Sequence, residues 1–195
     1  GINYSSDSAK PFSYRLRANM RQEDIGGQNR SMSLALSYQP TDRLSTSFDF
    51  KYETRSGWLL HNAGSEFTRF HSESLRPKLE VSYFLTASQQ ARLSLQWVGI
   101  KAFERDRWRL PSTGGQLVSD ETSAGLRRDF SISRLSFQAR YRWEIAPLSD
   151  LFVVYTRGSD LPSNIRSSFS NQLSEAWEQA LVDSLVVKIR YRFGN

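Results

Sequence analysis

The last residues of the chain, 185–193, alternate apolar and charged side chains almost to the C-terminus. Leu185, Val187 and Ile189 have one parity, whereas Lys188 and Arg190 have the other. Successive side chains of a β-strand point to opposite faces of the sheet. The pattern therefore predicts a strand with one face against an apolar environment and the other against water or further charges.

Seven more segments read as strands, so we expect eight strands in an all-β, antiparallel fold. The clearest of them carries Leu135 and Phe137 on one face and Arg140, Arg142 and Glu144 on the other. Gly99 interrupts the alternation of another and predicts a bulge there. The expected strands lie at about 10–21, 30–39, 43–55, 75–86, 91–103, 134–145 and 150–157, followed by the C-terminal strand.

The expected connections alternate between short and long. The short ones are 39–42, 86–90 and 146–150, and the long ones are 22–29, 56–74, 104–129 and 158–182. This asymmetry is typical of transmembrane β-barrels, with short periplasmic turns and long external loops, and strands of about 10–13 residues can cross a bilayer. One short helix is expected in the last loop, over 171–181, with Ser170 or Asn171 as its cap.

Composition is compatible with this architecture. The 195 residues are expected to form a single domain, 1–195, and they include no cysteine. The mean hydropathy is −0.54 and no run of about 18 apolar residues is present, but a barrel strand needs none because half of its side chains are polar. The net charge of +6 does not predict nucleic-acid binding, because the basic residues recur at strand spacing instead of clustering. The chain begins at Gly1 without a signal peptide, so we expect a mature form or a fragment.

Periodicity alone does not say which face points outward. A soluble, lipocalin-like carrier barrel would bury the apolar face, whereas a membrane barrel would turn it to lipid. We expect lipid, because large aromatics lie near expected strand ends: Phe12, Tyr38, Tyr52, Trp143, Tyr191 and Phe193. The barrel interior would then hold Arg15, Arg17, Lys51, Lys78, Glu80, Arg140, Arg142, Glu144, Lys188, Arg190 and Arg192. Eight strands would pack these charges as a solid plug, and a wider barrel would line an anion-favouring passage with them.

Catalytic chemistry is not expected. Segment 71–74 supplies His71, Ser72 and Glu73, the residue types of a rim hydrolase, but neighbours on an extended chain point in opposite directions. No metal-ligand spacing or cofactor fingerprint is present, so we expect no metal and no cofactor. Candidate ligand-binding residues are the loop aromatics Trp58, Trp108 and Trp177 and the basic residues Arg105, Arg107 and Arg109, which suit lipopolysaccharide headgroups.

Two stretches, 141–158 (YRWEIAPLSDLFVVYTRG) and 183–193 (DSLVVKIRYRF), carry a resemblance to a known family, and LQWVGI at 95–100 adds to it. They resemble the C-terminal outer-membrane β-barrel domain of an uncharacterised bacterial family with an N-terminal carbohydrate-binding, family-nine-like domain. The resemblance implies a bacterial outer-membrane location and a structural or transport-related role, in a carbohydrate-related uptake or surface assembly with a protein partner. The aromatic near the C-terminus resembles the signal that outer-membrane barrels present to the barrel-assembly machinery.

Overall fold

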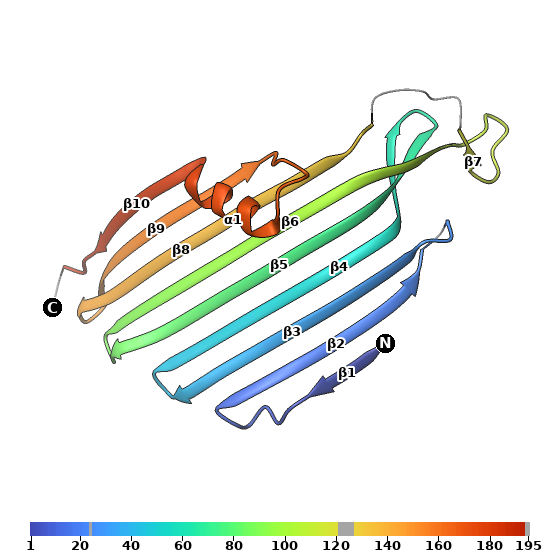
Figure 1. Cartoon of the computed structure of the whole chain (residues 1–195). Coiled ribbons are helices and arrows are strands. Elements are labelled where there is room, and N and C mark those ends of the chain that lie inside the picture. Colours follow the sequence, from blue (N-terminus) through green and yellow to red (C-terminus); the bar gives the residue numbers. More distant parts are fainter. Residues whose placement is uncertain (24, 121–126, 194–195) are drawn as a thin grey trace.

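The computed structural model describes residues 1–23, 25–120 and 127–193. Ten strands form one antiparallel sheet, in which neighbours in sequence are neighbours in space apart from the short β7 (Figure 1). The all-β antiparallel fold with one short helix is thus confirmed. The elements are β1 (Ile2–Ser5), β2 (Phe12–Gln22), β3 (Gln28–Thr41), β4 (Leu44–Ala63), β5 (Glu66–Thr86), β6 (Gln89–Arg109), β7 (Val118–Ser119), β8 (Phe130–Ala146), β9 (Ser149–Leu161), α1 (Phe169–Glu178) and β10 (Val182–Arg190).

Cross-strand register gives the sheet one apolar and one polar face. Leu16 pairs with Leu34 and Leu34 with Phe50, so these three side chains share a face. Arg17, one residue further, pairs with Ser33, which pairs with Lys51 on the other face. The alternation of the sequence is therefore kept in register from strand to strand, which is what fixes pairing in a sheet.

The prediction of a long loop at 56–74 is wrong. β4 and β5 continue through it and turn only at residues 64–65, where Gly64 has a φ of 55°. A register shift between Arg55 and Trp58 places Trp58 on the opposite face from Tyr52, although both residue numbers are even, so a period of two does not identify the strand there. Tyr52 consequently lies in the middle of β4. The long loop expected at 104–129 also begins later, since β6 runs to Arg109; residues 121–126 of it lie outside the described part of the chain.

Gly99 marks no bulge. Its pairing with Leu75 on β5 and with Ser133 on β8 follows the unbroken register on either side. A Cβ placed there would lie 2.2 Å from Cη2 of Trp97 and 2.9 Å from Cδ1 of Phe169. Glycine therefore makes room for two aromatic rings.

The helix spans 169–178 instead of the expected 171–181, and its cap is Ser168 instead of Ser170 or Asn171. The Ser168 side chain caps α1 by accepting a hydrogen bond from the backbone N–H of Asn171 (3.2 Å). The helix lies on the apolar face, over β6, β8 and β9 (Figure 1). Beneath it Trp97 and Leu135 pack with Ala176, all three buried, and Leu75, Leu95, Phe169 and Leu173 surround them. No helix among the described residues has the length and apolarity needed to cross a membrane.

The sheet is open. β1 and β10 lie at its opposite edges, and among the described residues no pairing joins them (Figure 1). The predicted closure of eight strands is therefore not present in this structure, although the eight long strands correspond to the eight expected ones. β1, which adds four residues to the edge of β2, and β7, a two-residue strand beside β6, were not predicted.

Candidate functional site

The polar face brings together most of the charged residues that the sequence assigned to an interior. Asp49 on β4 is the cross-strand partner of Lys78 on β5, and Arg142 on β8 is the partner of Gln90 on β6 and of Phe152 on β9. Following such pairs across the sheet places ten of the predicted interior charges on this one face: Arg15, Arg17, Lys51, Lys78, Glu80, Arg140, Arg142, Glu144, Lys188 and Arg190. Arg192 follows the end of β10, and its backbone N–H donates to Oγ of Ser149 (3.1 Å).

Ion pairs neutralise part of this charge. Lys51 contacts Glu53 and Lys78 contacts Glu80, each at 2.9 Å and each two residues apart on one strand. At the short-turn end Asp150, 1% exposed, accepts from Arg142 on β8 (2.9 Å) and from Arg190 on β10 (2.5 Å). This carboxylate joins three strands.

A groove of about 310 Å³ lies on the polar face over β4, β5, β6 and β8. Arg92 and Arg140 line it as direct cross-strand partners. Neither has a carboxylate within ion-pair distance in the part of the chain that the structure describes, whereas Glu80, which also lines the groove, is held by Lys78. Hydroxyl and amide groups complete the polar lining: Ser45, Ser47, Ser82, Ser94 and Gln138.

The other end of the polar face carries an aromatic cluster. Trp58, Phe70 and Phe130 pack with ring centroids 5.2–6.4 Å apart. Arg55 lies over the Trp58 ring (5.4 Å) and pairs with Glu23 (2.5 Å). Trp58, predicted to lie in a loop, is thus part of a packed strand.

The basic residues expected in a free loop lie on β6. Arg107 donates to Glu104 (2.6 Å) and Arg109 to Asp120 (3.0 Å), while Arg105 is exposed, at the position where the register with β5 shifts. Glu104 is buried, which opposes its ionisation, but the Arg107 guanidinium and the backbone N–H of Arg128 outweigh burial and hold the pKa of the carboxyl below its usual range. Two of the three basic residues are therefore engaged within the protein.

The remaining predicted aromatics lie on the apolar face. The Trp108 indole donates to Asp106 (2.6 Å) beneath the Arg69 guanidinium, which lies 5.8 Å from its ring. Trp177 on α1 packs edge-to-face on Phe137 (5.3 Å). Both indoles are held by internal contacts.

Comparison with known proteins gives one finding. The model of a family described as Domain of unknown function (DUF5916) matches residues 1–193. The chain belongs to this family. No curated protein and no solved structure shows significant similarity to it.

Within this member of the family, the hydrolase residue types do not assemble at segment 71–74. His71 lies 4.0 Å from Glu73. His71 pairs with Phe103 and Ser72 with Ala102, so Ser72 points to the opposite face. These three side chains therefore form no triad.

Sequence reasoning missed several residues that organise the polar face. Asp150 was assigned to a turn, and Glu104 to a loop. Gln90 was assigned to a turn, and Gln138 is a neutral amide in a strand, which resembles an ordinary surface residue. The available signal was the recurring spacing: a cation two residues from a carboxylate on β4 and β5, and two residues from a glutamine on β6 and β8.

Proposed function

We propose that this chain forms part of the wall of a bacterial outer-membrane β-barrel, with the apolar face toward lipid and the polar face toward the lumen. The observation that carries the proposal is a band on the apolar face with an aromatic lower border and a polar upper border. Much of this band is uncovered; Met32 is 65% exposed and Leu185 66%. Apolar patches of this extent mark interaction with a membrane or a partner.

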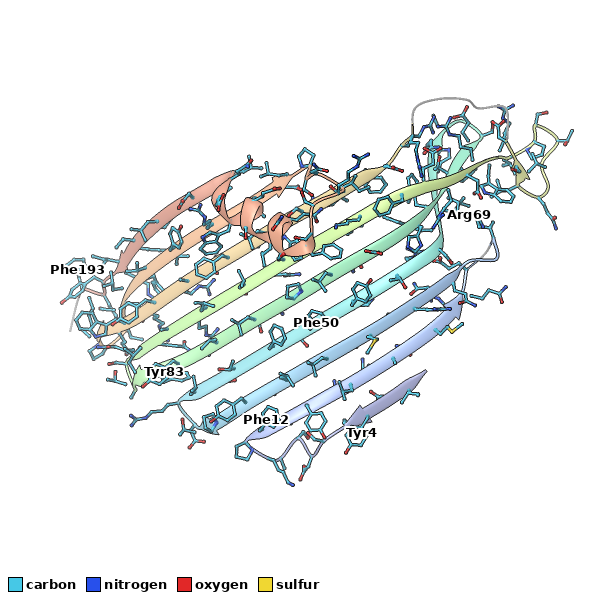
Figure 2. All side chains as sticks on the ribbon, in the orientation of Figure 1. Tyr4, Phe12, Phe50, Arg69, Tyr83 and Phe193 are labelled. Carbon is cyan, nitrogen blue, oxygen red and sulfur yellow. The ribbon has the colours of Figure 1, made fainter. Side chains whose placement is uncertain are left out.

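The lower border is a row of aromatic residues along the end with short turns. It runs from Phe12 and Tyr38 through Tyr83 and Trp143 to Tyr191, and Figure 2 labels Phe12, Tyr83 and Phe193 along it. Aromatic girdles of this kind lie at both interfaces of outer-membrane barrels.

This row crosses the strands at a slant. The cross-strand row of Phe12 reaches Val81 on β5, and Tyr83 lies two residues further toward the short turns. The row of Tyr83 in turn reaches Tyr141 on β8, and Trp143 lies two residues further in the same direction. The row of Trp143 reaches Ile189, two residues before Tyr191. From β2 to β10 the aromatic row thus falls by about 20 Å along the strands over about 34 Å across them, a tilt of roughly 30°. Barrel strands tilt by about 35–45°, close to this value.

The upper border is a polar row on the apolar face. Arg30, Thr54, Glu73 and Lys101 are successive cross-strand partners on β3, β4, β5 and β6. Eight residues separate this row from Tyr38 on β3, and ten separate it from Tyr83 on β5. With the tilt included, the band is about 23–29 Å tall, and the apolar band of outer-membrane barrels is about 25 Å.

The helix fits the upper border of this band. Its polar side chains Ser170, Asn171 and Glu178 are exposed, while Leu173 and Ala176 pack against the apolar face of the sheet. Arg157 donates to the Trp177 carbonyl (2.6 Å) and pairs with Asp183, so these two charged residues of the apolar face lie at the helix end. Such a helix belongs at the headgroup level.

The open sheet supports a barrel wider than these strands alone. Strand edges cannot stay unpaired in a bilayer, so β10 and the β1–β2 edge require further strands. In such a barrel the polar face would line an anion-favouring passage, and the role proposed for the chain is structural or transport-related, not enzymatic. The resemblance described above supports a carbohydrate-related uptake or surface assembly as the setting, with a protein partner and with assembly through the C-terminal strand. Outer-membrane lipid and lipopolysaccharide would surround it, and exposed Arg105 would be the nearest of the basic residues to the headgroups.

One observation favours a second candidate. The helix covers part of the apolar face, as a lid would in a soluble, lipocalin-like carrier with that face inward. Membrane fractionation separates the two. We expect the protein, produced in a Gram-negative host with these 195 residues in their natural polypeptide, to stay in the outer-membrane pellet after an alkaline carbonate wash. Recovery in the soluble fraction would establish the carrier.

A gel experiment tests the width of the barrel. We expect the 195-residue chain, refolded in detergent, to run identically on an SDS gel with and without boiling, because its edges lack partners. A heat-dependent shift would mean that the eight long strands close on themselves.

A further inference from the structure

Two arginines stand directly opposite each other on the polar face. Arg92 on β6 and Arg140 on β8 are Cα partners in register, and both line the groove of about 310 Å³. A second hollow of about 240 Å³ continues past them along Arg142 and Phe152. Like charges at opposite positions destabilise a sheet, so their juxtaposition calls for a function.

Two cations on neighbouring strands are neutralised. On β4 and β5, Lys51 and Lys78 each contact a glutamate two residues further along the strand. The carboxylate there both fixes the cation and cancels its charge.

Glutamines take the place of these glutamates beside the two arginines. Nη2 of Arg140 donates to Oε1 of Gln138 (2.9 Å). With the Gln90 amide oriented so that its oxygen faces Arg92, that oxygen accepts from Nε (3.0 Å) and Nη2 (3.1 Å) of the guanidinium. An amide oxygen orients a guanidinium but leaves its charge uncompensated.

The surrounding charges leave the pair positive. Glu80, the carboxylate in the groove, is held by Lys78, on which Asp49 also acts. Arg142 beyond the pair is bound to Asp150. The groove thus presents two oriented, uncompensated guanidiniums.

We propose that Arg92 and Arg140 bind the oxyanion group of a small solute: a carboxylate, sulfate or phosphate. Guanidinium groups match the planar oxygens of such anions with paired hydrogen bonds. Ser82 and Ser94 in the lining supply further hydroxyl donors. The groove is at the small end of ligand pockets, which suits a single acidic group on a compact solute. Its place inside a barrel rests on the proposed function; its anion chemistry does not.

The test is calorimetric titration of the purified protein, from whichever fraction contains it, with inorganic phosphate, glucuronate and glucose. Phosphate or glucuronate is expected to bind and glucose is not. Tighter phosphate binding would identify a free inorganic anion as the ligand, and tighter glucuronate binding an organic acid.

The matched variants are Gln90→Glu with Gln138→Glu, which keep both arginine contacts and cancel both charges. They are expected to weaken anion binding by about tenfold or more, because the two added carboxylates compensate the positive charge that attracts the anion. Gln22→Glu with Gln116→Glu adds the same charge at exposed positions away from the groove, and is expected to leave binding unchanged.

Absence of anion binding, or equal binding by the two double variants, would overturn the site. Carbonate-resistant association with the outer membrane, scored on the same preparations, keeps the two proposals apart. A membrane-embedded protein without anion binding overturns only the site. A soluble protein that binds the anions overturns only the membrane proposal.

Discussion

Replacing Gly99 with alanine should loosen the helix from the sheet. The new Cβ would meet Cη2 and Cζ2 of Trp97 at 2.2 and 2.7 Å, and Cδ1 of Phe169 at 2.9 Å. Trp97 is 1% exposed, and its indole N–H donates to Oγ of Ser133 (3.0 Å), which in turn donates to the Gln172 carbonyl of α1 (3.0 Å). The ring therefore cannot move without disturbing the contacts that hold α1.

Overpacking of this kind costs about 1–3 kcal/mol. We expect Gly99→Ala to destabilise the docked state of α1 by that amount and to raise hydrogen exchange in residues 169–178 by roughly 5- to 150-fold. The measurement is native-state hydrogen exchange followed by mass spectrometry, which reports local opening.

Trp97→Phe supplies the matched partner, because it removes both indole atoms that the new Cβ would meet. Alone it should cost about 1 kcal/mol or more, through the lost hydrogen bond and volume. In the double variant the alanine should cost much less than it does alone, giving a coupling energy of about 1 kcal/mol or more. Unchanged exchange in Gly99→Ala, or strict additivity, would refute the packing argument.

Three further predictions concern the charged contacts. Because the pKa of Glu104 is depressed in the folded protein, its stabilisation of the β6 end should be present in full above about pH 4.3 and lost as the pH falls through the folded-state pKa. Glu104→Gln should flatten this pH dependence in hydrogen exchange of residues 104–109. The same pH dependence in the variant and the unsubstituted protein would contradict it. Asp150→Asn should destabilise the β8–β9–β10 edge by about 1–2 kcal/mol, since the two guanidiniums that flank it are half-exposed; an unchanged urea midpoint would count against this. Arg157→Met should free the Trp177 carbonyl and expose the end of α1 to proteolysis, with Arg166→Met as the control of equal charge change; equal cleavage of both would disprove the contact.

The strands could be predicted where alternation is strict and short turns delimit it. β8 illustrates this, since Leu135 to Ile145 alternate with polar residues and Pro147 follows in the turn. The prediction failed where the register shifts: beyond Arg55, Trp58 lies on the polar face opposite Phe70, and a period of two no longer identifies the strand.

The candidate site could be predicted only in outline. Parity placed Arg140 and Arg142 on one face, but it could not show that Arg92 lies opposite Arg140, because register depends on the pairing of β6 with β8. It also could not show which cations are neutralised. That depends on whether glutamate or glutamine stands two residues away, and on Asp150, which reaches β8 and β10 from the start of β9.

The most direct test of the central claim is which face of the sheet contacts lipid. The chain has no cysteine, so single substitutions give unique labelling sites. The neighbouring pairs Leu16→Cys with Arg17→Cys, and Val187→Cys with Lys188→Cys, place a fluorophore on one face or the other of β2 and β10. In vesicles with brominated acyl chains, labels at 16 and 187 should be quenched by lipid and labels at 17 and 188 by aqueous iodide. The opposite assignment, or no quenching by lipid at any site, would contradict a membrane-facing apolar surface.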